Sequence, residues 1–495
     1  MRPFRLLGAL LLLILLGLGL VFISTFFPRE GPTRTASTKQ ATETPGGGMV
    51  VPSNVKRISV SPSGGLTASF FNDKLIYINS TVSDGDEAKY REILLYVFDL
   101  RSERVVSSIV IDKYQADSPE ALPCGEFKPG GTKGKYEPRY MLLGYDGRYI
   151  YYERDCVVPG KGVLEPLVYM VDEDTSTVIP SNISSRGVVA VGDGVVYKYL
   201  PDEGLVEALD VASNKTLWKH EYKPSYIFPQ PQGPGRAFIG SIKGAWISDG
   251  SLVMLLHDSD GSTGELIWVY GLVVASREGV EEFFFEAFRF KVYGALTYDI
   301  RVGFDGERVY VLTGVNSYGV EGDFVTLHSI SLDGEVKELL SRSIRLERGS
   351  LGLNMLVRED RVAVVYLVDD NKLVTMTRGN TTWIQEAPIQ VVEVLDKEGN
   401  VILNRELAGS YSLLGFKDDK VYLASGRYIY ALSPDTGLSQ IADLGPQGNI
   451  GAVVVLPILI PLLPFMEKPQ TLATTIDGTI YIYREGYLTI IKERA

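Results

Sequence analysis

The stretch of this 495-residue chain with the clearest metal-binding chemistry is HDSDGSTGE, which begins at His257. It carries Asp258, Asp260 and Glu265 around a glycine turn. Closely spaced carboxylates and turn carbonyls are the oxygen ligands that Ca²⁺ prefers, so these three residues are our candidate metal ligands. The stretch matches an EF-hand loop only at its D-x-D-G core, and a solvated hairpin loop is the competing interpretation.

Residue types for catalysis are scarce in this chain. Its three histidines, His220, His257 and His328, lie apart in strand-like segments. A serine nucleophile needs a nearby base, and the sequence contains no G-x-S-x-G turn. Zinc-ligand spacing of histidines and cysteines and a glycine-rich phosphate loop before a helix are also missing from the sequence. We therefore expect no catalytic residues.

The cysteines and the sequons indicate an oxidising compartment outside the cytoplasm. Cys124 and Cys156 fall in one local segment, which fits a single disulfide, with two unpaired thiols as the alternative. Four sequons for N-glycosylation support the same location. They begin at Asn79, Asn182, Asn214 and Asn380.

The N-terminal segment has the composition of a membrane anchor. Residues 6–28 are 23 residues without a charge, and a helix of that length measures roughly 34 Å, enough to cross a bilayer core. We expect residues 1–28 to be an uncleaved signal anchor, with a cleaved signal peptide as the alternative. Residues 29–53, rich in Thr, Pro and Gly, then form a flexible stalk.

The rest of the chain is acidic. The net charge is −12, although the first 52 residues hold five basic and only two acidic residues. An acidic body argues against nucleic-acid binding, whose affinity comes from basic residues that displace counterions. The scarcity of histidine and glutamine favours a prokaryotic surface protein, with a thermophilic archaeon as a candidate source.

From residue 54 onward the chain repeats one unit: an apolar strand, an acidic two-residue turn, and a strand of alternating aromatic and aliphatic residues. Asp-Gly between such strands is a strong hairpin signal, because both turn residues take positive φ. The turns are Asn72-Asp73, Asp146-Gly147, Asp193-Gly194, Asp249-Gly250, Asp305-Gly306, Glu359-Asp360, Asp418-Asp419 and Asp477-Gly478. The repeat predicts an all-β fold over residues 54–495, a β-propeller with eight blades favoured and seven as the alternative.

The two ends of this region predict how the ring closes. The opening NVKRISVSPS supplies one strand without a unit of its own, and the C-terminal segment supplies three strands. We expect them to share the eighth blade. Four innermost strands, within GLTASFF, YMLLGY, GVVAVG and YSLLGF, are apolar or small, so we expect an axial site to lack acid–base groups.

Residues 207–222, EALDVASNKTLWKHEY, and 428–441, YIYALSPDTGLSQI, resemble the repeat of the quinoprotein (PQQ-like) propeller superfamily. The resemblance implies a propeller of eight blades. Enzymes of that superfamily hold PQQ and Ca²⁺ on the axis beside vicinal cysteines, whereas Cys124 and Cys156 are far apart here. The resemblance therefore favours the non-enzymatic branch, which acts as scaffolds at membranes, and we expect no cofactor.

The stretch VVVLPILIPLLPFM, residues 453–466, is apolar and contains three prolines. It is too short for a membrane span, and its prolines exclude a regular helix or a central strand. Two interpretations remain, a buried strap over the axial opening or an exposed surface that binds a partner. The residues that would contact the partner are Leu456, Ile458, Ile460, Leu462, Leu463 and Phe465.

These observations predict a single-pass membrane protein whose propeller lies outside the cytoplasm and serves as a protein-binding or assembly scaffold at the cell surface. The rival hypothesis is a propeller enzyme, either a cofactor-dependent dehydrogenase or a glycan-acting enzyme, with its site on the axis. A propeller fold hosts many activities, so the choice rests on the missing catalytic groups and on the anchor.

Overall fold

The computed structural model describes most of the region predicted to be a propeller. The described ranges are 54–60, 67–84, 89–115, 139–157, 164–230, 234–262, 264–291, 296–316, 323–347, 351–358, 360–378, 381–444, 453–454 and 471–493. They belong to the second of two compact units, residues 51–495. Within these ranges no helix is long and apolar enough to cross a membrane. The expected anchor and stalk, residues 1–28 and 29–53, lie outside the described residues.

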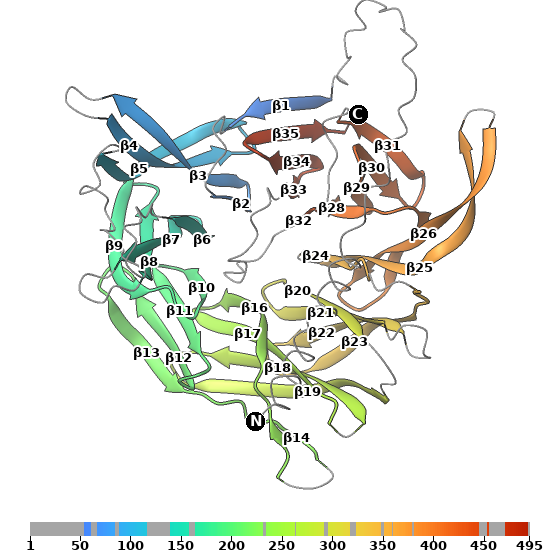
Figure 1. Ribbon diagram of the computed structural model, residues 1–495, viewed down its shortest axis with the longest axis horizontal. Helices are drawn as coiled ribbons and strands as arrows, with labels where there is room; N and C mark the ends of the chain where they lie inside the picture. Colours follow the sequence, from blue (N-terminus) through green and yellow to red (C-terminus); the bar gives the residue numbers. More distant parts are fainter. Residues whose placement is uncertain are drawn as a thin grey trace, which may run out of the picture. The chain divides into compact units, whose positions relative to one another are not determined.

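Eight sheets form the blades of this unit, and each has four antiparallel strands in the same order (Figure 1). One of these sheets also has a fifth, parallel strand at its inner edge, and two short strands form a separate sheet. The innermost strands are β2 (Thr67–Phe71), β6 (Tyr140–Tyr145), β10 (Val188–Gly192), β16 (Ser241–Ser248), β20 (Thr297–Phe304), β24 (Asn354–Arg358), β28 (Ser412–Lys417) and β33 (Thr471–Ile476). We number the blades 1 to 8 in this order.

The second strands are β3 (Lys74–Asp84), β7 (Tyr149–Val157), β11 (Val195–Leu200), β17 (Ser251–Asp260), β21 (Arg308–Asn316), β25 (Arg361–Arg378), β29 (Lys420–Ser425) and β34 (Thr479–Arg484). The third strands are β4 (Lys89–Asp99), β8 (Leu164–Asp172), β12 (Leu205–Asp210), β18 (Glu265–Ala275), β22 (Phe324–Ser331), β26 (Thr381–Asp396), β30 (Tyr428–Ser433) and β35 (Tyr487–Lys492).

The outermost strands are β5 (Arg104–Gln115), β9 (Thr177–Ser184), β13 (Lys215–Glu221), β19 (Val280–Lys291), β23 (Val336–Ser343), β27 (Val401–Ala408), β31 (Gly437–Asp443) and β1 (Val55–Ser59). Three short strands lie outside this pattern, β14 (Ile227–Phe228), β15 (Arg236–Ala237) and β32 (Val453–Val454). Blade 8 thus combines β1 from the start of the chain with β33, β34 and β35 from its end.

The blades form a closed ring. Each innermost strand contacts the innermost strand of the next blade, and β33 of blade 8 contacts β2 of blade 1. The middle strands are buried on both faces, as in β11, where Val195 to Tyr199 are all buried. The outer strand β13 has no buried residue and alternates between exposed and half-buried residues from Leu217 onward. The eight-bladed propeller predicted from the repeat is therefore confirmed.

The acidic turns connect the first and second strands of blades 1 to 5, 7 and 8, as the repeat predicted, and Glu359 of the blade 6 turn lies outside the described residues. Asp193, Asp249 and Asp477 have φ angles of 54°, 48° and 49°, and the glycine after each is also at positive φ. Two successive residues at positive φ make the turn that matches the twist of a tight hairpin.

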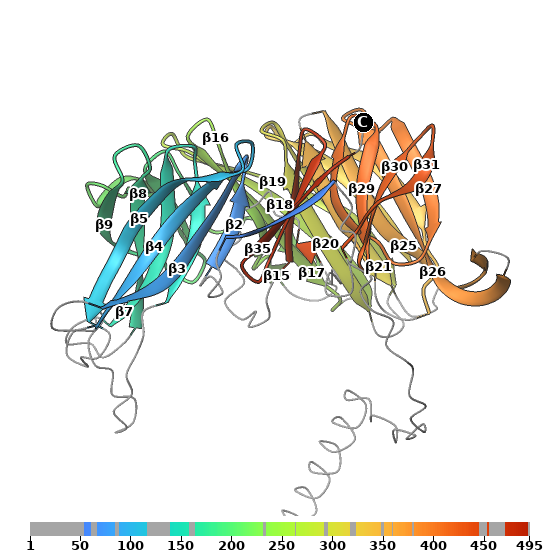
Figure 2. The same ribbon diagram turned by 90° about the horizontal axis from the view of Figure 1, so that it is seen from above.

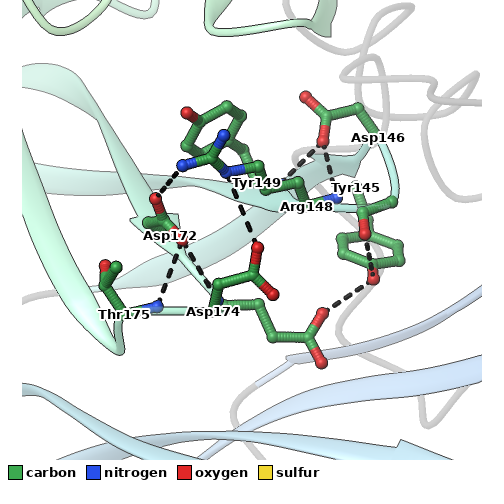
Figure 3. Close-up of polar contacts among 9 residues, drawn as sticks. Tyr145, Asp146, Arg148, Tyr149, Asp172, Asp174 and Thr175 are labelled. Carbon is green, nitrogen blue, oxygen red and sulfur yellow. Dashed lines mark hydrogen bonds and ion pairs between the residues drawn. The ribbon is translucent and has the colours of Figure 1, made fainter.

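Figure 3 shows how one of these turns is held, in blade 2. The carboxylate of Asp146 accepts the backbone N–H groups of Arg148 at 3.0 Å and Tyr149 at 2.7 Å. The guanidinium of Arg148 pairs at 2.8 Å with Asp172, whose carboxylate also accepts the N–H of Thr175 at 3.3 Å. The two hairpin turns of the blade are therefore linked to each other.

The same turns also connect neighbouring blades. Asp146 accepts the Tyr151 hydroxyl and the N–H of Asp193 in blade 3, both at 2.7 Å, and the Tyr151 oxygen accepts the N–H of Gly194 at 2.6 Å. Two other second-strand tyrosines donate to carbonyls of the following blade. They are Tyr197, to Gly250 at 3.1 Å, and Tyr481, to Leu100 at 3.0 Å. These tyrosines contribute to the closure of the ring.

Close packing of innermost strands gives a first testable prediction. A Cβ atom on Gly415 of blade 7 would overlap the buried side chain of Thr475 in blade 8. We expect Gly415→Ala to lower the free energy of unfolding by about 1–3 kcal/mol, the usual penalty of overpacking a core. Chemical denaturation measures the change. Gly261→Ala is the matched control, because its Cβ would meet only Leu266 at 3.8 Å. Equal stability of Gly415→Ala and wild type would contradict the prediction.

Candidate functional site

The residues predicted to bind calcium lie where β17 ends and β18 begins. The guanidinium of Arg236, on β15, lies 3.0 Å from Asp258 and 3.8 Å from Asp260. Asp258 also accepts the N–H of Ile239 at 2.8 Å. Burial alone would raise the pKa of Asp258, but Arg236 and the N–H donors outweigh it and hold the pKa below its usual value.

Glu265, the third predicted ligand, lies 4.0 Å from the guanidinium of Arg289. Among the described residues, no group of three His, Cys, Asp or Glu side chains is placed to hold a metal ion. The calcium site stays a prediction, and an ion there would have to displace Arg236, which also stacks 4.5 Å over Phe228. The sequence signal for this partner was weak, because Arg236 lies in the link between blades 3 and 4.

The predicted disulfide and glycosylation sites are only partly described. Cys156 lies in β7, and Cys124 lies outside the described residues, so their pairing stays a prediction. Asn79 is buried, with 7% of its surface exposed, whereas Asn182 and Asn214 are exposed. Asn380 lies outside the described residues.

The apolar stretch can be followed only at its beginning. Its first two residues form β32, which runs parallel to β33 at the inner edge of blade 8. The six residues proposed to contact a partner, Leu456, Ile458, Ile460, Leu462, Leu463 and Phe465, lie outside the described residues. Both interpretations of the stretch therefore stay open.

Charged residues occur on four innermost strands, where we expected an axial site to lack acid–base groups. Blades 4, 5 and 6 carry Lys243, Asp299, Arg301 and Arg358, and β28 of blade 7 ends at Lys417. Burial raises the pKa of Asp299 even though Arg301 lies 2.9 Å from its carboxylate. Arg301 also donates to the carbonyl of Leu353 in blade 6 at 3.0 Å. An acid with a raised pKa on an inner strand is a typical feature of functional sites.

The interface between blades 4 and 5 holds two of the three histidines. His257 and His328 are 5% and 6% exposed, and neither Nε2 of His257 nor Nδ1 of His328 has a hydrogen-bond partner. The ring of His257 lies 4.2 Å from that of Trp268 and 6.2 Å from that of Tyr298. The third histidine, His220, is bound at 2.8 Å to the carbonyl of Ser276.

A long hairpin extends from blade 6 beyond the rim of the ring (Figures 1 and 2). β25 and β26 stay paired as far as Arg378 and Thr381. β24 pairs with β25 only over residues 361–365, and β27 pairs with β26 only over residues 389–395. Between residues 372 and 387 neither edge of the hairpin has a neighbouring strand among the described residues.

The base of this hairpin is fixed, and two apolar side chains beyond the base are exposed. The N–H of Arg345 donates to the carbonyl of Val368 at 2.9 Å, and the N–H of Glu347 donates to Asp370 at 3.0 Å. Further out, Leu373 and Ile384 are 68% and 69% exposed. Apolar side chains on an unpaired hairpin are unusual on a soluble surface unless another molecule covers them.

Comparison with known proteins gives similar folds and no family. The β-propeller domain of the trilobed protease from Pyrococcus furiosus is 10% identical, with a TM-score of 0.32 over 70% of this chain and 89% of that chain. Hydrazine synthase from Kuenenia stuttgartiensis is 13% identical, with a TM-score of 0.33 over 74% and 99%. The dihydro-heme d1 dehydrogenase NirN is 14% identical, with a TM-score of 0.34 over 88% and 78%.

Identities and TM-scores this low carry no argument about the activity of this chain. No family model matches the chain, and no curated protein is similar to it in sequence. The resemblance to the quinoprotein branch therefore stays a prediction, while the propeller fold follows from the order of the strands and the closure of the ring.

Proposed function

We propose that this chain is a non-catalytic β-propeller, anchored in a membrane and exposed outside the cytoplasm, that binds a protein partner through the hairpin β25–β26. The partner adds an extended segment to an edge of the hairpin. The observation that carries the proposal is that, among the described residues, no other strand pairs with either edge of the hairpin between residues 372 and 387.

Unpaired strand edges present a row of free N–H and C=O groups, which is a template for another strand. Native proteins usually shorten or cover such edges, and this chain extends one instead. Leu373 and Ile384 provide apolar contact, while Lys372 and Glu386 provide charges at the border. The anchoring part of the proposal is supported by residues 6–28 and by the exposed sequons at Asn182 and Asn214. Residues 453–466 remain a second proposed contact surface.

A shortened hairpin tests the proposal. Lys372 and Ala387 are directly opposite each other, so residues 373–386 can be replaced by Asn-Gly, which closes a two-residue turn at that position. We expect this variant to melt at the wild-type temperature, because the base of the hairpin keeps its contacts with Arg345 and Glu347. We also expect it to lose a partner that wild type retains.

The contact itself is measured by photo-crosslinking in the full, membrane-bound chain. A crosslinker in place of Leu373 should join one segment of one partner, identified by mass spectrometry. The control position is Val401 on the outer strand β27, which is 48% exposed and should give no such product. Retention of the partner by the shortened variant, or equal crosslinking at both positions, would exclude the hairpin as the binding surface. If the crosslinked products contain only a second copy of this chain, the hairpin mediates self-association and does not bind a different protein.

A further inference from the structure

The outermost strand of blade 1, β5, lacks the usual protection of an edge strand. Its residues 105–111, VVSSIVI, contain neither a charge nor a proline. Among the other outermost strands, β9 has no charge but contains Pro180, and the uncharged runs in the remaining six are shorter. Charges and prolines on edge strands keep sheets from pairing edge to edge, so β5 is the outermost strand most open to such pairing.

The side chains along β5 are apolar and exposed. Val105, Val106 and Val110 are 44%, 44% and 47% exposed. β5 lies at the end of its sheet, and among the described residues no strand pairs with its outer edge. Its register with β4 shifts at two bulges, Val106 and Ile111, while residues 107–110 between them pair regularly. The bulges limit continuous pairing with another strand to a short stretch, so side-chain contacts have to contribute as well.

Two copies of one edge strand can pair antiparallel around a two-fold axis perpendicular to the sheet. Directly opposite residues share a face of the sheet, so one residue must lie opposite its own copy. With Ser108 at the axis, Val106 lies opposite Val110 of the second copy, and Val105 lies opposite Ile111. Two pairs of β-branched residues therefore meet on each side of the axis, and such cross-strand pairs stabilise a sheet.

The charges at the two ends of the strand select this position of the axis. With Ser108 at the centre, Glu103 lies opposite Lys113 of the second copy, and Arg104 lies opposite Asp112. Each charge thus meets the opposite sign, whereas like charges directly opposite each other would destabilise the pairing. An axis one residue earlier or later would place Arg104 opposite an apolar or aromatic residue instead.

From this self-complementarity we propose that β5 is the contact surface of a homodimer, in which two copies of the chain pair antiparallel along this edge. Within one chain Lys113 already pairs with Glu92 and Asp112 with Arg154, so the new ion pairs extend existing networks. Because the paired stretch is short, we expect a weak dimer with a dissociation constant in the micromolar range. The surface lies on blade 1 and is independent of the hairpin on blade 6.

Cysteine crosslinking in the full, membrane-bound chain tests both the contact and its register. Directly opposite Cα atoms in an antiparallel pair are about 4.5–5.5 Å apart, which is within the range of a disulfide. Ser108→Cys should therefore give at least about tenfold more disulfide-linked dimer than Ser341→Cys, which replaces an exposed serine on the outermost strand β23. Wild type, which contains Cys124 and Cys156, gives the background.

Two charge variants make the test specific. Added to Ser108→Cys, Val106→Glu and Val110→Lys should each lower the yield of dimer at least about fivefold, because charges on an edge oppose pairing. Their melting temperatures should not change, since both valines are exposed. Co-expression of the two variants should restore the crosslink, because the new carboxylate of one copy lies opposite the new ammonium of the other. Val401→Lys, on the outermost strand β27, is the matched control and should have no effect.

Three results would overturn the proposal or its register. Equal yields of dimer from Ser108→Cys and Ser341→Cys would exclude β5 as the contact, and so would a full yield in both charge variants. Faster crosslinking of Ser107→Cys than of Ser108→Cys would exclude the axis at Ser108. The chain with the shortened hairpin should still crosslink through Ser108→Cys, and loss of the product there would assign self-association to the hairpin instead of β5.

Discussion

Replacing Glu393 with alanine should lower the free energy of unfolding by about 3 kcal/mol, because it leaves hydrogen-bond donors inside the fold unpaired at about 1–3 kcal/mol each. The Glu393 side chain is fully buried on β26, and its carboxylate lies 3.1 Å from the guanidinium of Arg342 in blade 5. It also accepts the hydroxyl of Tyr366 at 3.0 Å and the side-chain amide of Asn404. Alanine would leave these donors unpaired between two blades.

Two further variants make this result specific. Glu393→Gln keeps the shape of the side chain and one acceptor oxygen, so we expect it to lose about 1.5 kcal/mol, the low end of the value of a hydrogen bond to a charged group. Glu406→Ala removes a 63% exposed carboxylate whose ion pair with Lys372 measures 3.6 Å, and it should have almost no effect. Denaturation at neutral pH measures all three. A loss in Glu393→Ala no larger than in Glu406→Ala would show that the buried contacts contribute little.

Replacing His257 with phenylalanine should flatten the dependence of stability on pH. Burial, assisted by the charge of Lys243 and opposed by Asp258, lowers the pKa of His257 from 6.5 to about 3. Between these two values the unfolded chain binds a proton that the folded chain does not. The free energy of unfolding therefore rises with pH in this window, by about 1.4 kcal/mol per pH unit from this residue alone. The contribution is complete above the unfolded value and decreases as the pH falls below it.

When the pH is lowered from 7 to about 4.5, the free energy of unfolding of wild type should fall by about 2.7 kcal/mol more than that of His257→Phe. The reason is that the change covers about two pH units below the unfolded pKa. Phenylalanine suits the aromatic surroundings, which include Tyr270 at 5.4 Å from the imidazole ring. Burial also lowers the pKa of His328, so a double variant with His328→Phe should be flatter still. Urea denaturation at several pH values provides the comparison. The same slope in wild type and His257→Phe would mean that His257 is protonated without opening the fold.

Residues that act within one hairpin could be predicted from the sequence. Asp193-Gly194 and Asp477-Gly478 need no distant contact to form a turn, because their φ angles and the alternation of the flanking strands are local properties. The regular recurrence of such turns then favours eight blades over seven, since each unit must bury its strands against two neighbours. For this reason the eight-bladed fold could be derived from residues 54–495.

Contacts between units could not be predicted in this way. Arg236 reaches Asp258 from the link between blades 3 and 4, and this decides what surrounds the proposed calcium ligands. His257 could be placed on a strand, but its burial against Trp268 and Tyr298 depends on how blade 4 meets blade 5. The outer part of the hairpin has no neighbouring strand among the described residues, because β25 and β26 are longer than β24 and β27. Only the pairing of the strands shows this difference.

The sequence by itself thus determined the repeat, the turns and the class of fold, because these follow from the periodicity of neighbouring residues. The tertiary structure alone decided which polar groups meet, which stay without a partner and which edge is left unpaired. Those outcomes depend on packing between segments far apart in the chain, where a shift of one residue in register moves a side chain to the opposite face of its strand.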